Sequence, residues 1–224
     1  MELQNPLYKN QGVHVISTIF TIDKGVFKVL LIRRSNEPFK DKWALPSGAL
    51  YNNELITDGA KREVLEKTGI TEIDLEMFDI FSALDRNPVI RMIGVGFIGL
   101  IDQNKVEILK ETTKTNNADW FKIDSIPELA FDHNEVLNKG VEVLKRKIVK
   151  SNILSSLYPT GVTLPELQKA YEAILGRELD RRNFRSKMLR LGLIYDTKKT
   201  IVFEGKKPAK LYMFYEKIEE KNVF

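Results

Sequence analysis

The stretch GALYNNELITDGAKREVLEKTGI, residues 48–70, decides how the first part of this 224-residue chain folds. Within it, residues 54–68 have the apolar spacing of a helix. Gly69 follows in the position where a glycine caps a helix C-terminus. The stretch therefore predicts a loop at Gly48 that leads into one helix.

Charged side chains gather on one face of this predicted helix. Residues three and four apart on a helix lie side by side, so Glu63, Glu66 and position 67 converge beside the loop carbonyl of Gly48. Carboxylates and a carbonyl are the oxygen ligands that Mg²⁺ prefers, and the ion would neutralise a diphosphate and activate water. Glu63 and Glu66 are therefore the candidate catalytic and metal-ligating residues.

Position 67 is a lysine, which changes the electrostatics of this patch. Its ammonium pairs with Glu63 one turn away and places positive charge where a metal ligand would stand. Metal affinity and metal-dependent hydrolysis should fall, whereas an anionic ligand can still bind, because lysine is itself a phosphate partner. The cofactor expected, if any, is weakly bound Mg²⁺. The alternative is a working enzyme whose other glutamates suffice.

The same stretch resembles the Nudix signature. The match covers Gly48, Glu54, Arg62, Glu63, Val64, Glu66, Gly69 and Ile70, and the departure is Lys67. The preceding KWALPSG (42–48) also resembles the usual start of that motif. The resemblance implies an α/β (α+β) fold, the Nudix α/β/α sandwich with a mixed sheet, in which Arg62 and Glu54 brace the loop against the helix.

The rest of residues 1–149 reads as strands and helices of one domain. β-branched, apolar runs predict strands, the first two joined as a hairpin by DKG, at 13–22, 26–34, 76–84, 91–101 and 118–123. Asp132 and Glu135 stand three apart like a capping box and predict a helix to about residue 149.

Residues 150–224 predict a second, smaller domain. Capping residues and glycines bound two short helices: Thr163, Glu166 and Gly176 for the first, Asp180 and Gly192 for the second. Three short strands are expected next, at 193–197, 200–205 and 210–217. Helix, turn, helix and β-ribbon is the order of a winged helix-turn-helix.

The second of these helices carries the basic charge. Residues 151–224 hold 14 Lys and Arg against 9 Asp and Glu, whereas residues 1–150 hold 21 against 22. Phe184, Met188 and Leu191 form an apolar stripe that packs inward. The outward side chains and the lysines at the ribbon tip are the candidate DNA contacts: Arg181, Arg182, Asn183, Arg185, Ser186, Lys187, Arg190, Lys206, Lys207 and Lys210. A merely solvated basic surface is the alternative.

The two domains together resemble the NrtR-type transcriptional regulators. The resemblance runs through NEPFKDKWALPSG (36–48), ALDRNPVIRMIGVGF (83–97), LAFDHNEVL (129–137) and LQKAYEAILGRELDRRNFRSKMLRLGLI (167–194). It implies control of NAD-related genes and a sensor of ADP-ribose, and related regulators of this architecture respond to sugars such as arabinose. The candidate ligand-binding residues are then Trp43, Gly48, Arg62, Lys67, Arg86 and Arg91.

Three of these candidates have a structural alternative. By the resemblance, Arg86 and Arg91 border the ligand pocket, where arginines suit a diphosphate. The alternative is a loop salt bridge with Asp85. Trp43 either stacks on a base or sugar or anchors the loop from below. His14 and His133 are expected to be structural.

The overall composition narrows the compartment and the partners. The chain has no cysteine, so disulfides, thiolate zinc sites and cysteine nucleophiles are excluded. Its N-terminus lacks the pattern of a signal peptide, and its apolar runs are too short to span a bilayer. We therefore expect a cytoplasmic protein without a membrane partner.

We interpret the sequence as a ligand-responsive transcription factor. Its expected partners are double-stranded operator DNA, a small-molecule effector (ADP-ribose-like or a sugar) and a second copy of the chain, because two recognition helices must meet two half-sites. The competing hypothesis is a Mg²⁺-dependent Nudix hydrolase of ADP-ribose or another nucleoside diphosphate derivative. An RNA-binding Nudix protein is a third alternative.

Overall fold

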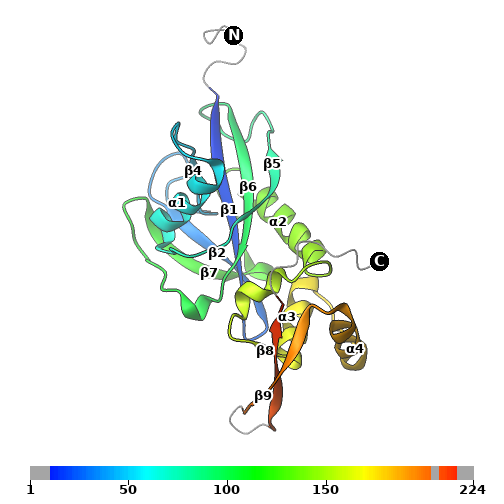
Figure 1. Cartoon of the computed structure of the whole chain (residues 1–224). Coiled ribbons are helices and arrows are strands. Elements are labelled where there is room, and N and C mark those ends of the chain that lie inside the picture. Colours follow the sequence, from blue (N-terminus) through cyan, green and yellow to red (C-terminus); the bar gives the residue numbers. More distant parts are fainter. Residues whose placement is uncertain (1–10, 203–206, 216–224) are drawn as a thin grey trace. The chain divides into compact units, whose positions relative to one another are not determined.

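The structure, a computed structural model, describes residues 11–202 and 207–215 (Figure 1). Contacts divide the chain into two compact units. The first holds the N-terminal segment to Phe20 with residues 28–99 and 104–140, and the second holds residues 21–27, 100–103 and 141 onward. The predicted domain boundary at residue 149 stays a prediction. In the part of the chain described, no helix is long and apolar enough to cross a membrane.

Residues 12–147, most of which belong to the first unit, build a seven-stranded sheet with two long helices. The sheet has the order β3-β2-β1-β6-β5, with β4 paired to β1 and β7 paired to β2. The elements are β1 (Gly12–Asp23), β2 (Val26–Arg34), β3 (Trp43–Ala44), β4 (Ser47–Ala49), α1 (Ile56–Thr68), β5 (Glu76–Phe81), β6 (Met92–Leu100), η1 (Gln103–Lys105), β7 (Thr115–Lys122), η2 (Ile123–Ser125) and α2 (His133–Lys147). Every strand predicted for this unit is present, although β5 is shorter than 76–84 and β7 begins before residue 118.

The sheet is mixed, as predicted. The pairs β1–β4, β2–β3, β2–β7 and β5–β6 are antiparallel. At one end of β1 and β6 the Gly12 amide donates to the Arg91 carbonyl, and further along the Thr18 hydroxyl donates to the Phe97 carbonyl. The residue numbers of the paired positions therefore increase together on both strands. These two central strands therefore run in the same direction.

The two long helices cover opposite faces of this sheet (Figure 1). Val15 of β1 packs in one core cluster with Ala60 of α1. Thr18 of the same strand lies against Gly140 of α2, where an added Cβ would stand 2.9 Å from the Thr18 hydroxyl. Odd and even residues of a strand point to opposite faces. The predicted α/β/α sandwich is therefore the observed architecture.

Helix α1 ends at the site that the sequence marks but begins later than predicted. It starts at Ile56, two residues after the predicted start, and Glu54 lies in the preceding loop, where its carboxylate accepts from the Tyr51 amide. It ends at Gly69, whose φ of 78° is left-handed and whose amide donates to the Leu65 carbonyl. Glycine adopts that conformation without steric cost, so the cap confirms the prediction.

The second unit holds two capped helices and a three-stranded sheet. Thr163 and Glu166 form the predicted capping box, and the Asp180 carboxylate accepts from the Asn183 amide. Both helices end at left-handed glycines, Gly176 and Gly192. The elements are η3 (Ile153–Leu157), β8 (Val162–Thr163), α3 (Leu164–Leu175), α4 (Arg181–Leu191), β9 (Ile194–Ile201) and β10 (Ala209–Phe214).

The ribbon differs from the predicted three strands. Residues 194–197 and 200–201 of the two predicted strands belong to the one strand β9, which continues through Lys198 even though that residue has a φ of 64°. A register shift on the partner strand between Lys210 and Tyr212 accommodates the irregularity. The third strand is β8, so the sheet order is β8-β10-β9. Residues 203–205, 216 and 217 of the predicted strands lie outside the described part of the chain.

Candidate functional site

The loop at Gly48 approaches α1 so closely that only glycine fits. Gly48 lies in β4, which pairs with β1. A Cβ added to Gly48 would stand 2.0 Å from the carboxyl carbon of Glu63, whose side chain is buried. Gly48 therefore places the loop backbone directly against the Glu63 carboxylate of α1, the helix that carries the signature residues and is called the motif helix below.

Arg62 ties this loop to the helix. Its guanidinium donates two hydrogen bonds to Glu54, at 2.8 and 2.7 Å, and one to the Ala49 carbonyl at 2.9 Å. The guanidinium carbon also lies 3.8 Å from the centre of the Tyr51 ring. The hydrogen bond from Arg62 lowers the pKa of Glu54 to about 2. The predicted brace of Arg62 and Glu54 is thus present, and Arg62 as a ligand contact stays a prediction.

Lys67 lies in the interior beside Glu63. Its side chain is 10% exposed, and its ammonium nitrogen stands 3.7 Å from Glu63 Oε2. That oxygen has no hydrogen-bond partner among the described residues. Burial lowers the pKa of Lys67, and the charge of Glu63 partly opposes that shift. The predicted Lys67–Glu63 pair is therefore present as a buried contact of opposite charges.

A second lysine, Lys114, enters the same patch from a distant part of the chain. Its ammonium donates to Glu66 Oε2 and lies 3.8 Å from Glu63 Oε1. Partial burial lowers the pKa of Lys114, but the hydrogen bond to Glu66 and the charges of both glutamates outweigh it, so the pKa rises. Sequence reasoning missed Lys114 because no local spacing relates it to the helix.

The acidic patch is already neutralised by these cations. Three carboxylates face three cations, each within an ion-pair distance of a partner: Glu54, Glu63 and Glu66 with Arg62, Lys67 and Lys114. Over the described residues there is no group of three or more His, Cys, Asp or Glu side chains arranged to hold a metal ion. The two motif carboxylates that remain for a divalent ion carry ammonium partners, so this ligand set does not fit Mg²⁺, which demands an octahedral shell of oxygens.

Arg86 and Arg91 are occupied by the protein itself. Arg86 is buried and donates two hydrogen bonds of 2.9 Å to the Asp132 carboxylate, so the predicted partner Asp85 is wrong. Asp132 consequently gives this carboxylate to Arg86 rather than to the predicted capping box of α2. Arg91 donates to the carbonyls of residues 82 and 83. Their contact with a ligand stays a prediction.

Trp43 and the two histidines fill structural positions in the described fold. The Trp43 ring meets the Phe121 ring edge-on, with 4.6 Å between centroids. His133 Nδ1 accepts a hydrogen bond of 3.1 Å from the Leu45 amide, and burial lowers its pKa. Burial, with Lys67 second, lowers the pKa of His14 to about 3. Both histidines are therefore neutral, and Trp43 as a stacking platform stays a prediction.

The second unit presents its basic residues outward. Phe184 and Met188 of α4 are buried, as the apolar stripe predicts, and Leu191 is partly buried. The predicted DNA contacts on this helix are exposed: Arg181, Arg182, Asn183, Arg185, Ser186, Lys187 and Arg190. Arg182 and Ser186 lie one turn apart on the face opposite the stripe. Lys206 lies outside the described residues.

A basic cavity joins α4 to the ribbon. It has a volume of about 500 Å³, and its walls include the N-terminus of α3, α4 and the start of β10. Among the described residues that line it, five are cationic: Lys169, Arg181, Arg185, Lys207 and Lys210. Lys210 is also held by Asp196 at 2.8 Å. Cations that converge on a groove beside an exposed helix suit the phosphate backbone of a nucleic acid.

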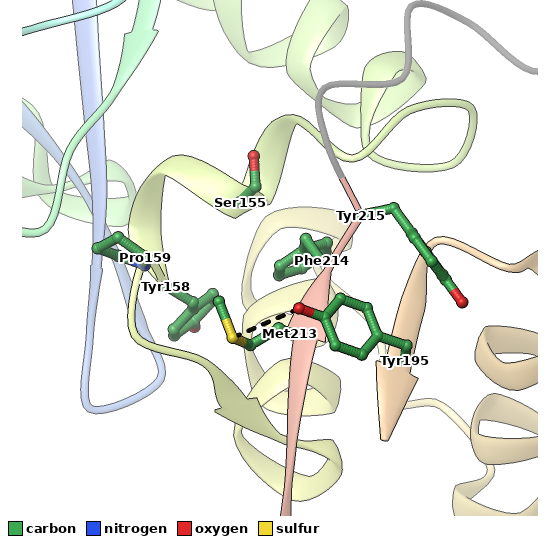
Figure 2. A pocket seen from close by; sticks show the side chains of 7 residues that line it. All are labelled: Ser155, Tyr158, Pro159, Tyr195, Met213, Phe214 and Tyr215. Atoms are coloured by element: carbon green, nitrogen blue, oxygen red, sulfur yellow. Dashed lines mark hydrogen bonds between the residues drawn. The ribbon is translucent and has the colours of Figure 1, made fainter. Parts of the chain in front are cut away.

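A second cavity of the same unit has a different character. Figure 2 shows Tyr195 and Tyr215 beside Met213 and Phe214, with the Tyr195 hydroxyl 3.7 Å from the Met213 sulfur. The cavity measures about 780 Å³, and none of the described residues that line it is charged. These side chains offer a polyanion no cation, whereas those of the basic cavity do, so the basic cavity is the candidate nucleic-acid interface.

Known proteins share both parts of this architecture. The NUDIX domain family matches residues 12–140, and the NrtR DNA-binding winged helix domain family matches residues 154–214. The ADPR responsive transcriptional repressor NtrR of Acinetobacter baylyi is 33% identical over 217 residues, which are 95% of this chain and 86% of that protein.

Two further matches bear on the two units. The crystal structure of Shewanella oneidensis NrtR complexed with a 27mer DNA has a TM-score of 0.79 and 27% identity, covering 91% of this chain and 93% of that one. An ADP-ribose pyrophosphatase of Methanocaldococcus jannaschii is 34% identical over 110 residues, 49% of this chain and 63% of that protein.

Proposed function

Because the chain belongs to the NrtR family of DNA-binding regulators, in which a NUDIX domain precedes a winged helix, we propose that it is an ADP-ribose-responsive transcriptional repressor. The winged helix binds operator DNA. The NUDIX domain binds ADP-ribose or a closely related metabolite, and this binding changes the affinity for DNA. The relative from Acinetobacter baylyi, with its described response to ADP-ribose, supports the choice of ligand.

The basic surface of α4 is the observation that carries the DNA-binding half. Arg182 and Ser186 face away from the core, and Arg181 and Arg185 line the basic cavity with Lys207 of the ribbon. Arginine pairs bidentately with guanine edges in the major groove, and lysines neutralise phosphates. The outward face of α4 can thus contact bases, while the side chains at the basic cavity can bind the phosphate backbone of the DNA.

The charge balance of the motif helix supports a ligand-binding role rather than a hydrolytic one. Lys67 stands where the signature has a glutamate, and Lys114 pairs with Glu66. Metal-dependent hydrolysis needs carboxylates that are free to bind the ion, because the ion activates the water. We therefore propose that hydrolysis is absent or very slow, and that the NUDIX domain binds its ligand without cleaving it.

We also propose that the regulator acts as a homodimer. A winged helix on each of two copies would meet two half-sites about one helical turn apart on the DNA. A ligand shifts such an assembly only by the difference between its affinities for the DNA-binding and the released states. Sedimentation of the protein with and without a duplex reports the stoichiometry, and a 1:1 complex would contradict this part.

The DNA-binding half is tested with a duplex that the protein itself selects from random-sequence DNA. We expect a palindromic consensus, and tighter binding to it than to a scrambled duplex of equal length. Raising the salt concentration should weaken both, because cations on α4 and the ribbon displace counterions from the phosphates. Equal affinity for the selected and the scrambled duplex would refute sequence-specific binding.

The second candidate function is a Nudix hydrolase that cleaves ADP-ribose with Mg²⁺. The similarity of the NUDIX domain to the pyrophosphatase of Methanocaldococcus jannaschii favours it. The two functions separate when the protein is incubated with Mg²⁺ and ADP-ribose and the release of AMP is followed. Rapid release that Glu63→Gln abolishes would establish the enzyme, and its absence supports the regulator.

A further inference from the structure

Lys114 sits on a turn whose backbone hydrogen bonds define its position. The Thr112 amide donates to the Thr115 carbonyl at 2.9 Å, and the Thr115 amide donates back at 3.3 Å. The Lys114 amide donates to the Thr112 hydroxyl at 3.2 Å. The turn leads directly into β7, so the pairing of β7 in the sheet fixes the position of the Lys114 backbone.

The segment before this turn is docked on the end of the motif helix. The Leu109 amide donates to the Thr68 carbonyl at 2.9 Å. The Leu109 side chain lies so close to Gly69 that a Cβ there would stand 2.7 Å from its Cγ. The segment from Leu109 to Lys114 therefore touches α1 at both ends, and Lys114 reaches the glutamates from a fixed base.

The two lysines divide the motif carboxylates between them. Lys114 faces Glu63 Oε1 and Glu66 Oε2, and Lys67 faces Glu63 Oε2 from the other side. A divalent ion needs the lone pairs of those same oxygens, and it would also meet two ammonium groups within a few ångströms. The ammonium groups of Lys67 and Lys114 therefore compete with a divalent ion for the carboxylate oxygens of Glu63 and Glu66.

The exposure of the two lysines differs, which separates their roles. The Lys67 side chain is 10% exposed, whereas that of Lys114 is 36% exposed. More of the Lys114 side chain is therefore open to an anion from the solvent. The Lys67 side chain is far less accessible, and its ammonium lies against the Glu63 carboxylate.

We propose that the ammonium groups of Lys114 and Lys67 occupy the position beside Glu63 and Glu66 of α1 where a divalent ion would bind. The NUDIX domain therefore excludes Mg²⁺ and binds an anionic effector without a metal. The first half of this proposal, the exclusion of the ion, stands independently of the effector's identity. Its second half rests on the proposed function, because it assumes that the effector carries phosphate. Lys114 then offers that phosphate a positive charge that a metal supplies in a hydrolase.

The test of the first half measures Mn²⁺ binding to the full-length protein by electron paramagnetic resonance of the free ion. The variants are Lys114→Met, Lys114→Gln, Lys67→Glu and the double variant K67E/K114M. Lys110→Met is the matched control, because Lys110 is a lysine of the same segment that pairs with Asp119 away from the motif. Unfolding curves of every variant establish that each one is folded.

We expect the wild type and Lys110→Met to bind Mn²⁺ weakly and alike. Lys114→Met, Lys114→Gln and Lys67→Glu should each bind at least about tenfold more tightly, and the double variant on the order of 100-fold more tightly, because each substitution removes an ammonium beside the carboxylates and Lys67→Glu also adds a carboxylate ligand. Wild-type affinity equal to that of the double variant would overturn the proposal. So would Lys114 variants that bind no better than Lys110→Met.

The second half is tested by measuring ADP-ribose affinity in EDTA and in Mg²⁺ by calorimetry. We expect the same affinity in both buffers for the wild type, and a loss of about tenfold or more in Lys114→Met but not in Lys110→Met. Binding that requires Mg²⁺ would overturn this half. If ADP-ribose binds in neither buffer, the proposed effector is wrong, while the Mn²⁺ series still decides the first half.

Discussion

The ammonium of Lys114 hydrogen-bonds the carboxylate of Glu66 across 48 residues of sequence. This contact joins the turn before β7 to the motif helix and completes the neutralisation of the acidic patch. The chemistry of the site therefore depends on a residue outside the signature as well as on Lys67 within it.

The DNA-binding surface predicts a sharp difference between arginines. Arg182→Ala should weaken binding to the selected duplex by about tenfold, because a bidentate arginine contact is worth about 1–3 kcal/mol. Arg185→Ala should also weaken it, because it removes a cation that neutralises phosphate. ADP-ribose affinity should not change in either variant. Arg177→Ala, at an exposed position just after α3, is the control. Fluorescence anisotropy of the labelled duplex measures the effect, and unchanged affinity in both α4 variants would show that α4 is not the recognition helix.

The close approach of Gly48 to Glu63 predicts a coupling between the two positions. Gly48→Ala should destabilise the protein by about 1–3 kcal/mol, because the new methyl group overlaps the carboxylate. Removing that carboxylate with Glu63→Ala should make the same substitution much less costly. A double-mutant cycle by urea unfolding measures this coupling. Additive effects would mean that the loop and helix are not in contact.

The buried pair of Arg86 and Asp132 predicts a stability role for Arg86. Arg86→Ala should cost about 3–5 kcal/mol in the free energy of unfolding, because it leaves a carboxylate without its partner in the interior. Arg86→Lys should also cost stability, since lysine cannot make both hydrogen bonds. Urea unfolding decides the matter. If Arg86 serves only a ligand, both variants will unfold like the wild type.

The two histidines predict a pH dependence of stability. His14 and His133 are the protein's only histidines, and folding lowers the pKa of both below 6.5. Below pH 6.5 the unfolded chain therefore binds more protons than the folded one, and stability falls as the pH falls. Each contributes up to about 1.4 kcal/mol per pH unit.

Thermal melts between pH 7 and pH 5 follow this dependence in a range above the titration of ordinary carboxylates. His14→Gln should reduce the slope of melting temperature against pH by about half, because one of two equal contributions is removed. A slope that the substitution leaves unchanged would place the titrating groups elsewhere.

Local rules predicted much of the fold. The caps at Gly69, Gly176 and Gly192 and the capping box of Thr163 follow from the conformations and hydrogen bonds that those residue types favour. The apolar stripe of Phe184 and Met188 follows from helical periodicity. Each of these depends only on neighbours within one or two turns, which the sequence displays directly.

What the sequence could not show were partners brought together by tertiary structure. Asp132 has the spacing of a helix cap, but a buried guanidinium from the loop before β6 claims its carboxylate. Lys114 lies on a loop with no pattern of its own. In the ribbon, β9 runs through Lys198 because strand pairing outweighs the local turn signal. Long-range electrostatics and pairing decided all three.

The most direct test of the account follows the labelled duplex by anisotropy while ADP-ribose is added in EDTA, with AMP assayed in parallel in Mg²⁺. If the NUDIX domain binds ADP-ribose without cleaving it and controls the winged helix, ADP-ribose will release the duplex in EDTA, and no AMP will form in Mg²⁺. Unchanged DNA affinity at saturating ADP-ribose, or rapid formation of AMP, would contradict it.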